Sequence, residues 1–356
     1  MSTSSTSSTS LLNRAKRHGT PLIDGDQVTF VWQGEHPVQV VGDFNYWATF
    51  FEQPLLMERA GTNLWKATIT LPRDAYGEYH FLQGDQHFPD PLNKRTSPNG
   101  MGATNNVFWM PDYAPSPLAI VNKEIPHGEV THYDLNGGWY YAGTSRTVHL
   151  YKPPTDEPTP LLIVLDGTQY LRRSKINVIV DNLIAQQRIR PISMAMVEPS
   201  KRIRLHEYGC SDVTVAFIVH RLFPLASAHL NLLDYHQHSG VHGIMGASMG
   251  GLMSLYTALR VPYLFGKVLS ESGAFLSDHL YFDSVIFDLL PHADRSNYKL
   301  YMDCGLQEWF IHPNRETYDR LKVWGYDVTF REHSSGHNYP SWRDHLADGL
   351  VHLFGV

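Results

Sequence analysis

The sequence predicts an α/β protein in which a doubly wound sheet is preceded by a small all-β sandwich. The 356 residues are enough for two domains, and 42% of them are hydrophobic, which is sufficient for two buried cores. The first third contains short alternating strands between turns rich in Gly, Pro and Asp, as in a sandwich. The rest alternates apolar strands with helical patterns, which indicates a mainly parallel sheet covered by helices.

Changes in composition set the expected boundaries. Residues 1–25 should form a disordered or short helical tail, because the first ten are rich in Ser and Thr. Residues 26–112 should form the sandwich. Residues 113–118 form a proline-rich linker, expected to be extended and fairly stiff, and residues 119–356 form the α/β domain.

Strands of the sandwich are expected where β-branched and aromatic residues recur. The segment 64–71 alternates most clearly, and one of its sides carries Trp65, Ala67, Ile69 and Leu71. The other expected strands cover residues 28–32, 38–45, 78–82 and 106–110.

In the second part, the unbroken apolar run 161–165 predicts a strand buried on both faces of a parallel sheet. Residues 128–135 and 145–151 alternate like an antiparallel pair at the edge. Further strands are expected over 192–198, 243–245, 267–269, 299–303 and 327–332. Helices are expected over 175–187, 212–230, 250–260, 313–324 and 341–353.

The most informative stretch is Gly246-Ala247-Ser248-Met249-Gly250-Gly251, between an apolar strand and a helix of small and apolar residues. It fits the G-x-S-x-G nucleophile elbow of α/β-hydrolases, in which the serine is raised on a sharp turn above the sheet edge. Gly246 and Gly250 are expected to let the strand and the helix pass close together. The alternative is an ordinary strand-to-helix turn whose serine caps the helix.

In the hydrolase order, an acid and then a histidine follow the serine. His337 is the candidate base because it lies in the loop between the last expected strand and the last helix, whereas His333 falls at the end of that strand. Glu308 is preferred as the acid because its loop position lets a long side chain reach the histidine. Asp303 and Asp319 remain alternatives.

The segment Val38–Trp47 reads Val-x-Val-x-Gly-Asp-Phe-Asn-x-Trp and is followed by Leu64-Trp65, Leu71-Pro72, Tyr79-x-Phe81 and Phe88-Pro89-Asp90-Pro91. These residues resemble the early-set immunoglobulin-like modules that precede glycogen-branching enzymes and some esterases. Several such modules bind glucans through exposed tryptophans. Trp47 could therefore bind a glycan, or it could pack on the partner domain.

The C-terminal two thirds resembles the enterochelin-esterase branch of the esterase D superfamily. The matching residues are Leu165-Asp166-Gly167, Arg204 to Tyr208, Gly246 to Gly251, Ser270 to Gly273, Asp303 to Glu308 and Gly336 to Arg343. The resemblance implies Ser248 as nucleophile, His337 as base and Glu308 as acid. It also implies an oxyanion hole from the backbone N–H of Met249 and one near Gly167 or Thr168.

The sequence departs from this family at the elbow, which carries Ala247 and Met249, and at Asn338, where an aspartate is common. The implied activity is that of a serine esterase whose first-choice substrate is a ferric tri-catecholate siderophore lactone. Two alternatives are a carbohydrate-directed esterase that removes feruloyl or acetyl groups, and a catalytically inactive hydrolase fold that acts as a binding module.

Cationic side chains that follow the two central strands could bind such an anionic substrate: Arg172, Arg173, Lys175, Lys201, Arg202 and Arg204. Ordinary surface charge is the other interpretation of the same residues.

Composition narrows the remaining classes of partner. A net charge of −6 argues against a general nucleic-acid binder. The chain has no H-E-x-x-H and no C-x-x-C, so no metal site or cofactor is expected. There is no secretory signal and no apolar run of about 18 residues, so we expect a cytoplasmic protein without a membrane span. The sequence leaves the oligomeric state open.

Overall fold

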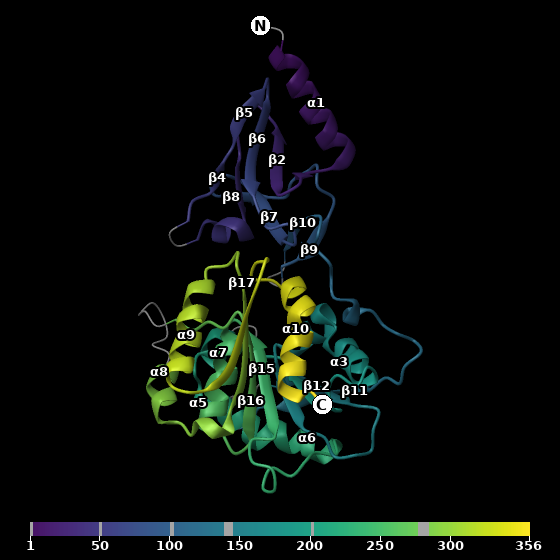
Figure 1. Ribbon diagram of the computed structural model, residues 1–356, viewed down its shortest axis with the longest axis vertical. Coiled ribbons are helices and arrows are strands. Elements are labelled where there is room, and N and C mark those ends of the chain that lie inside the picture. The colour runs from purple at the N-terminus through teal and green to yellow at the C-terminus, as the bar shows by residue number, and fades with distance from the viewer. Residues whose placement is uncertain (1–2, 50–51, 100–102, 139–144, 201–202, 277–284) are drawn as a thin grey trace. The chain divides into compact units, whose positions relative to one another are not determined.

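The computed structural model describes residues 3–49, 52–99, 103–138, 145–200, 203–276 and 285–356 (Figure 1). The chain divides into two compact units, each of which is described by itself. The first unit comprises Met1–Ala114, Gly305–Trp309 and His333–Ser341. The second comprises Pro115–Cys304, Phe310–Glu332 and Trp342–Val356. Two short segments from late in the chain therefore belong to the same compact unit as its first third.

The first third forms two antiparallel sheets. One has the order β1 (Leu22–Asp24), β2 (Gln27–Gln33), β6 (Leu64–Thr70) and β5 (Glu58–Gly61). The other has the order β4 (Leu55–Leu56), β3 (Gln39–Gly42), β7 (Tyr76–Gln83), β10 (Thr104–Trp109) and β9 (Thr96–Pro98), with β8 (Gln86–Phe88) also paired to β7. The all-β character predicted for this region is confirmed.

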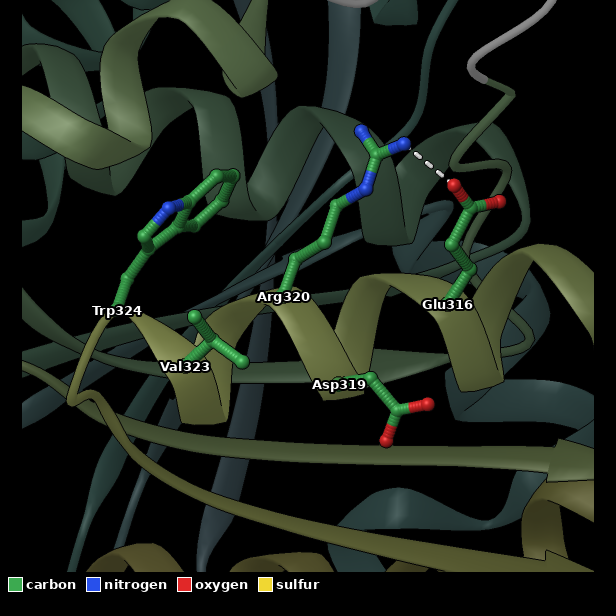
Figure 2. A pocket seen from close by; sticks show the side chains of 5 residues that line it. All are labelled: Glu316, Asp319, Arg320, Val323 and Trp324. Carbon is green, nitrogen blue, oxygen red and sulfur yellow. Dashed lines mark hydrogen bonds and ion pairs between the residues drawn. The ribbon is translucent and has the colours of Figure 1, made fainter.

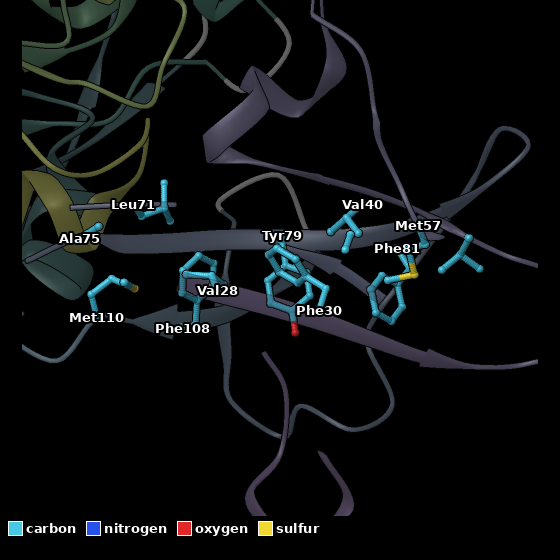
Figure 3. Packing of buried hydrophobic residues seen from close by; sticks show 12 residues of the cluster. Val28, Phe30, Val40, Met57, Leu71, Ala75, Tyr79, Phe81, Phe108 and Met110 are labelled. Carbon is cyan, nitrogen blue, oxygen red and sulfur yellow. The ribbon is translucent and has the colours of Figure 1, made fainter. Parts of the chain in front are cut away.

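Aromatic side chains from both sheets fill the space between them (Figure 3). Phe30 of β2 is fully buried and meets Tyr79 of β7 edge-on, with ring centroids 4.9 Å apart. The side of β6 predicted to be apolar faces this cluster, because Trp65, Ala67, Ile69 and Leu71 all belong to it. Large aromatics bury much area and hold their neighbours in edge-to-face packing, so they fix the sandwich.

The N-terminal tail is more ordered than the sequence predicts. Helix α1 runs from Thr3 to His18, where disorder was expected over the first ten residues. Its buried Ala15 packs with Leu22, Val31 and Leu64, on the side of β2 and β6 that faces away from the aromatic core. Strand β1 pairs with β2, so the sandwich begins at Leu22 instead of residue 26. Long-range packing of one apolar helix face explains the difference.

The second unit is built on a mixed sheet with the order β11-β12-β14-β13-β15-β16-β17-β18. The strands are β11 (Glu129–Asn136), β12 (Ser145–Lys152), β13 (Leu161–Leu165), β14 (Ser193–Val197), β15 (His242–Ala247), β16 (Phe265–Glu271), β17 (Lys299–Gly305) and β18 (Asp327–His333). The antiparallel edge pair β11–β12 and the parallel central strands β14, β13, β15 and β16 are as predicted. Every residue of β13 is buried.

Helices lie on both faces of this sheet, with α3 and α10 on one side and α7 and α9 on the other (Figure 1). The longer helices are α3 (Ile176–Ala185), α7 (Met249–Arg260), α9 (Ile311–Val323) and α10 (Tyr339–Phe354). The helix predicted over 212–230 consists of α5 (Asp212–Phe217), a π-helical turn and α6 (Phe223–His229). Three short helices were not predicted, because they have too few residues to show a helical repeat of apolar side chains in the sequence: α2 (Gly167–Gln169), α4 (Arg204–Tyr208) and α8 (Ile286–Leu289).

His242, the first residue of β15, is a fully buried histidine in the middle of the sheet. Its Nδ1 accepts the backbone N–H of Leu161 at 3.0 Å. Burial, assisted by the charge of Lys267, lowers the pKa of His242 to about 4. The folded state therefore binds this proton less well than the unfolded chain, in which a histidine titrates near pH ~6.5. The stability that neutral His242 contributes is complete above that pH and is lost as the pH falls toward 4.

We predict that His242→Gln flattens the pH dependence of unfolding, because a glutamine oxygen can accept the Leu161 N–H without titrating. Between pH 7 and pH 4.5 the variant should gain on the order of 2 kcal/mol relative to the wild type, since one pKa unit corresponds to about 1.4 kcal/mol. Denaturant unfolding of both proteins across this pH range measures the difference. Parallel pH curves would contradict the assignment.

Candidate active site

Ser248 is held in a strained backbone conformation between the end of β15 and the start of α7. Its φ of 59° and ψ of −125° lie in a region that residues with side chains rarely adopt. Backbone hydrogen bonds fix it there: its N–H donates to the carbonyl of Glu271 at 2.9 Å, and its carbonyl accepts from Ala274 at 3.0 Å. Ala247 and Met249 are buried, whereas Ser248 is partly exposed. This is the geometry of a nucleophile elbow.

The glycines of this turn differ in what they allow. A Cβ at residue 246 would lie 2.7 Å from the backbone carbon of Gly250, closer than real Cβ atoms approach backbone. A Cβ at Gly251 would lie 2.3 Å from Ser270 Oγ. At Gly250 the nearest atom is a carboxylate oxygen of Asp166 at 3.4 Å, which is an ordinary contact. The expectation that Gly250 also needs to lack a side chain is wrong, because the crowded pair is Gly246 and Gly251.

Glu308 and His337, the candidate acid and base, form a hydrogen-bonded pair in the first unit. Glu308 lies in the loop after β17 and His337 in the loop between β18 and α10, and the distance between Glu308 Oε2 and His337 Nδ1 is 2.5 Å. The Glu308 side chain is 1% exposed and the His337 side chain 27%. The other Glu308 oxygen, Oε1, accepts the N–H of Gly305 at 2.8 Å, so the carboxylate is held from two sides.

The two loops are also joined through their backbones. The N–H of Leu306 donates to the carbonyl of His333 at 2.7 Å, and that of Gln307 donates to the carbonyl of Ser335 at 3.0 Å. A Cβ at Gly305 would lie 2.2 Å from the oxygen of Ser335, so this position also requires glycine. The loop that carries Glu308 and the loop that carries His337 therefore form one hydrogen-bonded structure.

The alternative acids and base lie elsewhere. Asp303 is buried within β17 and stands in register with Glu271 of β16. Asp319 is exposed on α9. His333 ends β18, as the sequence predicts, and its backbone carbonyl serves the loop contacts described above. Ser248 belongs to the second unit and the Glu308–His337 pair to the first.

Two candidate oxyanion donors stand at helix starts in the second unit. Met249 is the first residue of α7, so its N–H has no acceptor within that helix. Gly167 starts α2 directly after β13, and its backbone lies so close to β14 that a Cβ would be 2.3 Å from Met196 C. The N–H of Thr168 donates to Glu198 Oε2 at 3.0 Å. Because the Thr168 N–H already has this acceptor, Gly167 is the better of the two candidates.

Arg204 is a partly exposed side chain whose charge is paired with Asp166. Its guanidinium makes a two-pronged contact with the carboxylate of Asp166, at 2.7 and 2.6 Å, and lies over the ring of Tyr208. The Tyr208 hydroxyl accepts the N–H of Asp166 at 3.1 Å. Asp166 has a φ of 55° and directly precedes Gly167, so these contacts hold the turn that presents the Gly167 N–H.

The other predicted cations differ in exposure. Arg172 is exposed and Arg173 half-buried on the π-helical turn Tyr170–Ser174. Lys175, which follows this turn, is exposed. Lys201 and Arg202 lie outside the described residues.

Sequence reasoning missed two carboxyl groups beside these elements. Glu271 of β16 is fully buried and accepts a short hydrogen bond from the hydroxyl of Tyr170. Burial, together with the neighbouring charge of Asp303, raises the pKa of Glu271 well above its usual value, so its carboxyl favours the neutral form. Asp43 is the second, and it was visible only as part of the Gly-Asp-Phe-Asn motif of the sandwich.

Helix α9 carries an open surface pocket of ≈ 470 Å³ lined by Glu316, Asp319, Arg320, Val323 and Trp324 (Figure 2). Arg320 pairs with Glu316 one turn away. The lining contains no serine, cysteine or histidine, so it does not hold the nucleophile or the histidine base of a serine esterase.

Comparison with known proteins identifies the family. A family model named Esterase and described as "Putative esterase" matches residues 141–353, more than half of the chain. The chain belongs to this esterase family. Iron(III) enterobactin esterase of Escherichia coli K12 is 25% identical over 337 residues, which cover 85% of this esterase and 82% of the relative. Iron(III) salmochelin esterase of Escherichia coli O6:H1 is 25% identical and covers 93% and 88%.

Solved structures agree in fold over nearly the whole length. The ferric enterobactin esterase of Salmonella typhimurium superposes with a TM-score of 0.74 at 22% identity, covering 92% of this esterase and 93% of that chain. The enterobactin esterase of Shigella flexneri, crystallised in the presence of enterobactin, gives 0.73 at 23% identity over 92% of each chain. The predicted resemblance to enterobactin esterases with an N-terminal β region is thus confirmed. Among the described residues, no helix has both the length and the apolar character needed to cross a bilayer.

We predict that Gly246→Ala and Gly250→Ala behave in opposite ways, although both glycines belong to the motif. The first introduces a methyl group 2.7 Å from backbone and should abolish folding of the elbow, lowering the melting temperature and the rate at which Ser248 reacts with a fluorophosphonate. The second meets only ordinary contacts in a helix, where alanine is about 1 kcal/mol better than glycine. Its melting temperature should be unchanged or higher. Equal damage by both substitutions would overturn this account of the turn.

Proposed function

We propose that this esterase hydrolyses carboxylic esters with Ser248 as nucleophile, His337 as base and Glu308 as acid. Two observations support the proposal: the strained turn that exposes Ser248, and the 2.5 Å contact between Glu308 Oε2 and His337 Nδ1. The second carries it, because a buried carboxylate on one ring nitrogen fixes the tautomer in which the other nitrogen, Nε2, can take a proton.

In the proposed reaction, Ser248 Oγ attacks the ester carbonyl while His337 Nε2 removes its proton. The N–H groups of Met249 and Gly167 stabilise the negative oxygen of the tetrahedral intermediate; losing one such donor typically costs about 100- to 1000-fold in rate. The intermediate collapses, and the alcohol leaves with the proton from His337. Water then attacks the acyl-enzyme with the same base, releasing the carboxylic acid and restoring Ser248.

We further propose that the substrate is a catecholate siderophore lactone, taken with or without its ferric ion. The relatives named as iron(III) enterobactin and salmochelin esterases match most of their own length, 82% and 88%. The ferric catecholate complex is anionic, and Arg172 is an exposed cation on the segment that follows the candidate oxyanion turn. A positive group near the site would attract such a substrate.

The first test is a hydrolysis panel of ferric and iron-free tri-catecholate lactones, feruloyl esters, acetylated sugars and a neutral aryl ester. The wild type should cleave the lactones fastest. Ser248→Ala should lose at least about 1000-fold, and Glu308→Gln about 100- to 10,000-fold, because the ring loses its orienting charge. Preference for feruloyl or acetyl esters would replace the siderophore assignment. No cleavage and no fluorophosphonate labelling would instead favour a binding module.

A second test separates the arginines. Arg172→Glu combined with Arg173→Glu should raise KM for the ferric catecholate roughly tenfold, equivalent to about 1.4 kcal/mol, and leave the neutral aryl ester unchanged. Arg204→Leu should instead lower kcat for both substrates by about 10- to 100-fold, because it releases Asp166 and the Gly167 turn. Equal losses on both substrates in the double variant would discard the binding role of Arg172 and Arg173.

A further inference from the structure

Asp43 is a buried carboxyl group in the turn that follows β3, and it is 2% exposed. Its Oδ2 accepts the backbone N–H of Glu78 at 2.8 Å, and its Oδ1 accepts the indole N–H of Trp47 at 3.0 Å. These contacts bind the turn Asp43–Ala48 to β7. They also show that the indole of Trp47 is engaged within its own unit.

The same carboxyl group contacts both sequence neighbours of His337. The side-chain amide of Asn338 donates to Asp43 Oδ2 at 3.2 Å. On the other side, a Cβ at Gly336 would lie 2.1 Å from Asp43 Cγ, so the glycine backbone lies directly against the carboxyl group. His337 is thus held between two residues that Asp43 contacts.

Asn338 also binds the start of the helix that follows, α10. Its Oδ1 accepts the N–H of Ser341 in the first turn of α10 at 3.0 Å, while its Nδ2 binds Asp43. A second sandwich contact, from the N–H of Tyr76 to the carbonyl of Ser334 at 3.1 Å, fixes the start of the same loop. The loop that carries the base therefore takes its shape from the N-terminal sandwich as well as from its own strand and helix.

We propose that Asp43 is a positioning residue for His337, acting through Asn338 and Gly336 to hold the imidazole where Glu308 can orient it. This inference rests on the proposed function of His337. It gives the sandwich a role in the reaction, because a misplacement of about 1 Å in a catalytic group can cost about 100-fold in rate. Burial and the charges of Glu78 and Glu308 raise the pKa of Asp43, so a further carboxylate at residue 338 should be poorly tolerated.

The test exchanges the two ends of the Asp43–Asn338 contact. Asn338→Asp should lower kcat for the neutral aryl ester about 100-fold with KM unchanged, because it places two carboxyl groups together and breaks the contact. The double variant Asp43→Asn/Asn338→Asp restores a donor facing an acceptor. It should recover at least about tenfold of the lost kcat, though not all, because the N–H of Glu78 loses its acceptor.

Two further variants guard the interpretation. Asn338→Ala removes the donor without adding charge and should lower kcat about tenfold, which keeps the proposal testable if Asn338→Asp does not fold. The control exchanges an exposed ion pair of the sandwich, Glu58→Lys/Lys66→Glu, and should leave kcat and KM within about twofold of the wild type.

The outcomes distinguish this inference from the proposed function. If the wild type cleaves no ester, the proposed function fails and the positioning role fails with it. If the wild type is active and Asn338→Asp and Asn338→Ala keep kcat within about twofold, Asp43 does not position His337, and the esterase assignment stands. Equal loss in Asn338→Asp and in the exchanged double variant, or a change in KM alone, also overturns the positioning role.

Discussion

The close approach of β15 and α7 is the constraint on which the second unit depends. A Cβ at residue 246 would lie 2.7 Å from the backbone carbon of Gly250, so this position has no room for a side chain. The close approach of the two residues requires a sharp bend in the chain between them. The bend places Ser248 at a φ that costs on the order of 1–3 kcal/mol, and such strain persists only where the surroundings over-determine it. The backbone hydrogen bonds of Ser248 with Glu271 and Ala274 hold the residue in this conformation.

The proposed acid and base, Glu308 and His337, depend on a different part of the molecule. Glu308 and His337 lie on loops whose backbones bind each other, and both loops belong to the same compact unit as the sandwich. Asp43 contacts the residues on either side of His337. The proposed nucleophile, Ser248, is therefore held by contacts with the sheet, whereas the proposed acid and base are held by loop contacts that include the N-terminal third. This division explains how an all-β module can matter to the chemistry without supplying a triad residue.

The sequence predicted those parts of the fold whose structure is determined by residues close together in the chain. The apolar run of β13, the alternation in β6 and the glycine-flanked serine each carry their signal within ten residues. The order of α1 could not be predicted in this way, because that helix packs against Val31 and Leu64, which come well after it in the sequence. The hydrogen bond donated by the Thr168 N–H could not be predicted either, because its acceptor, Glu198, lies 30 residues later. The contact between Asp43 and Asn338 spans 295 residues, and nothing near either residue indicates it.

Asp303 and Glu308, the two carboxyl groups that the sequence offers as the acid of the triad, differ in their positions in the fold. Asp303 lies on β17 in register with Glu271, whose pKa is raised by burial and by the charge of Asp303. A triad acid holds the imidazole ring in one tautomer, so its carboxylate has to reach a ring nitrogen. Glu308 makes that contact: one of its oxygens accepts the Gly305 N–H and the other lies 2.5 Å from His337 Nδ1. The loop after β17 therefore places its glutamate beside the imidazole, whereas the aspartate within the strand lies next to another buried acid.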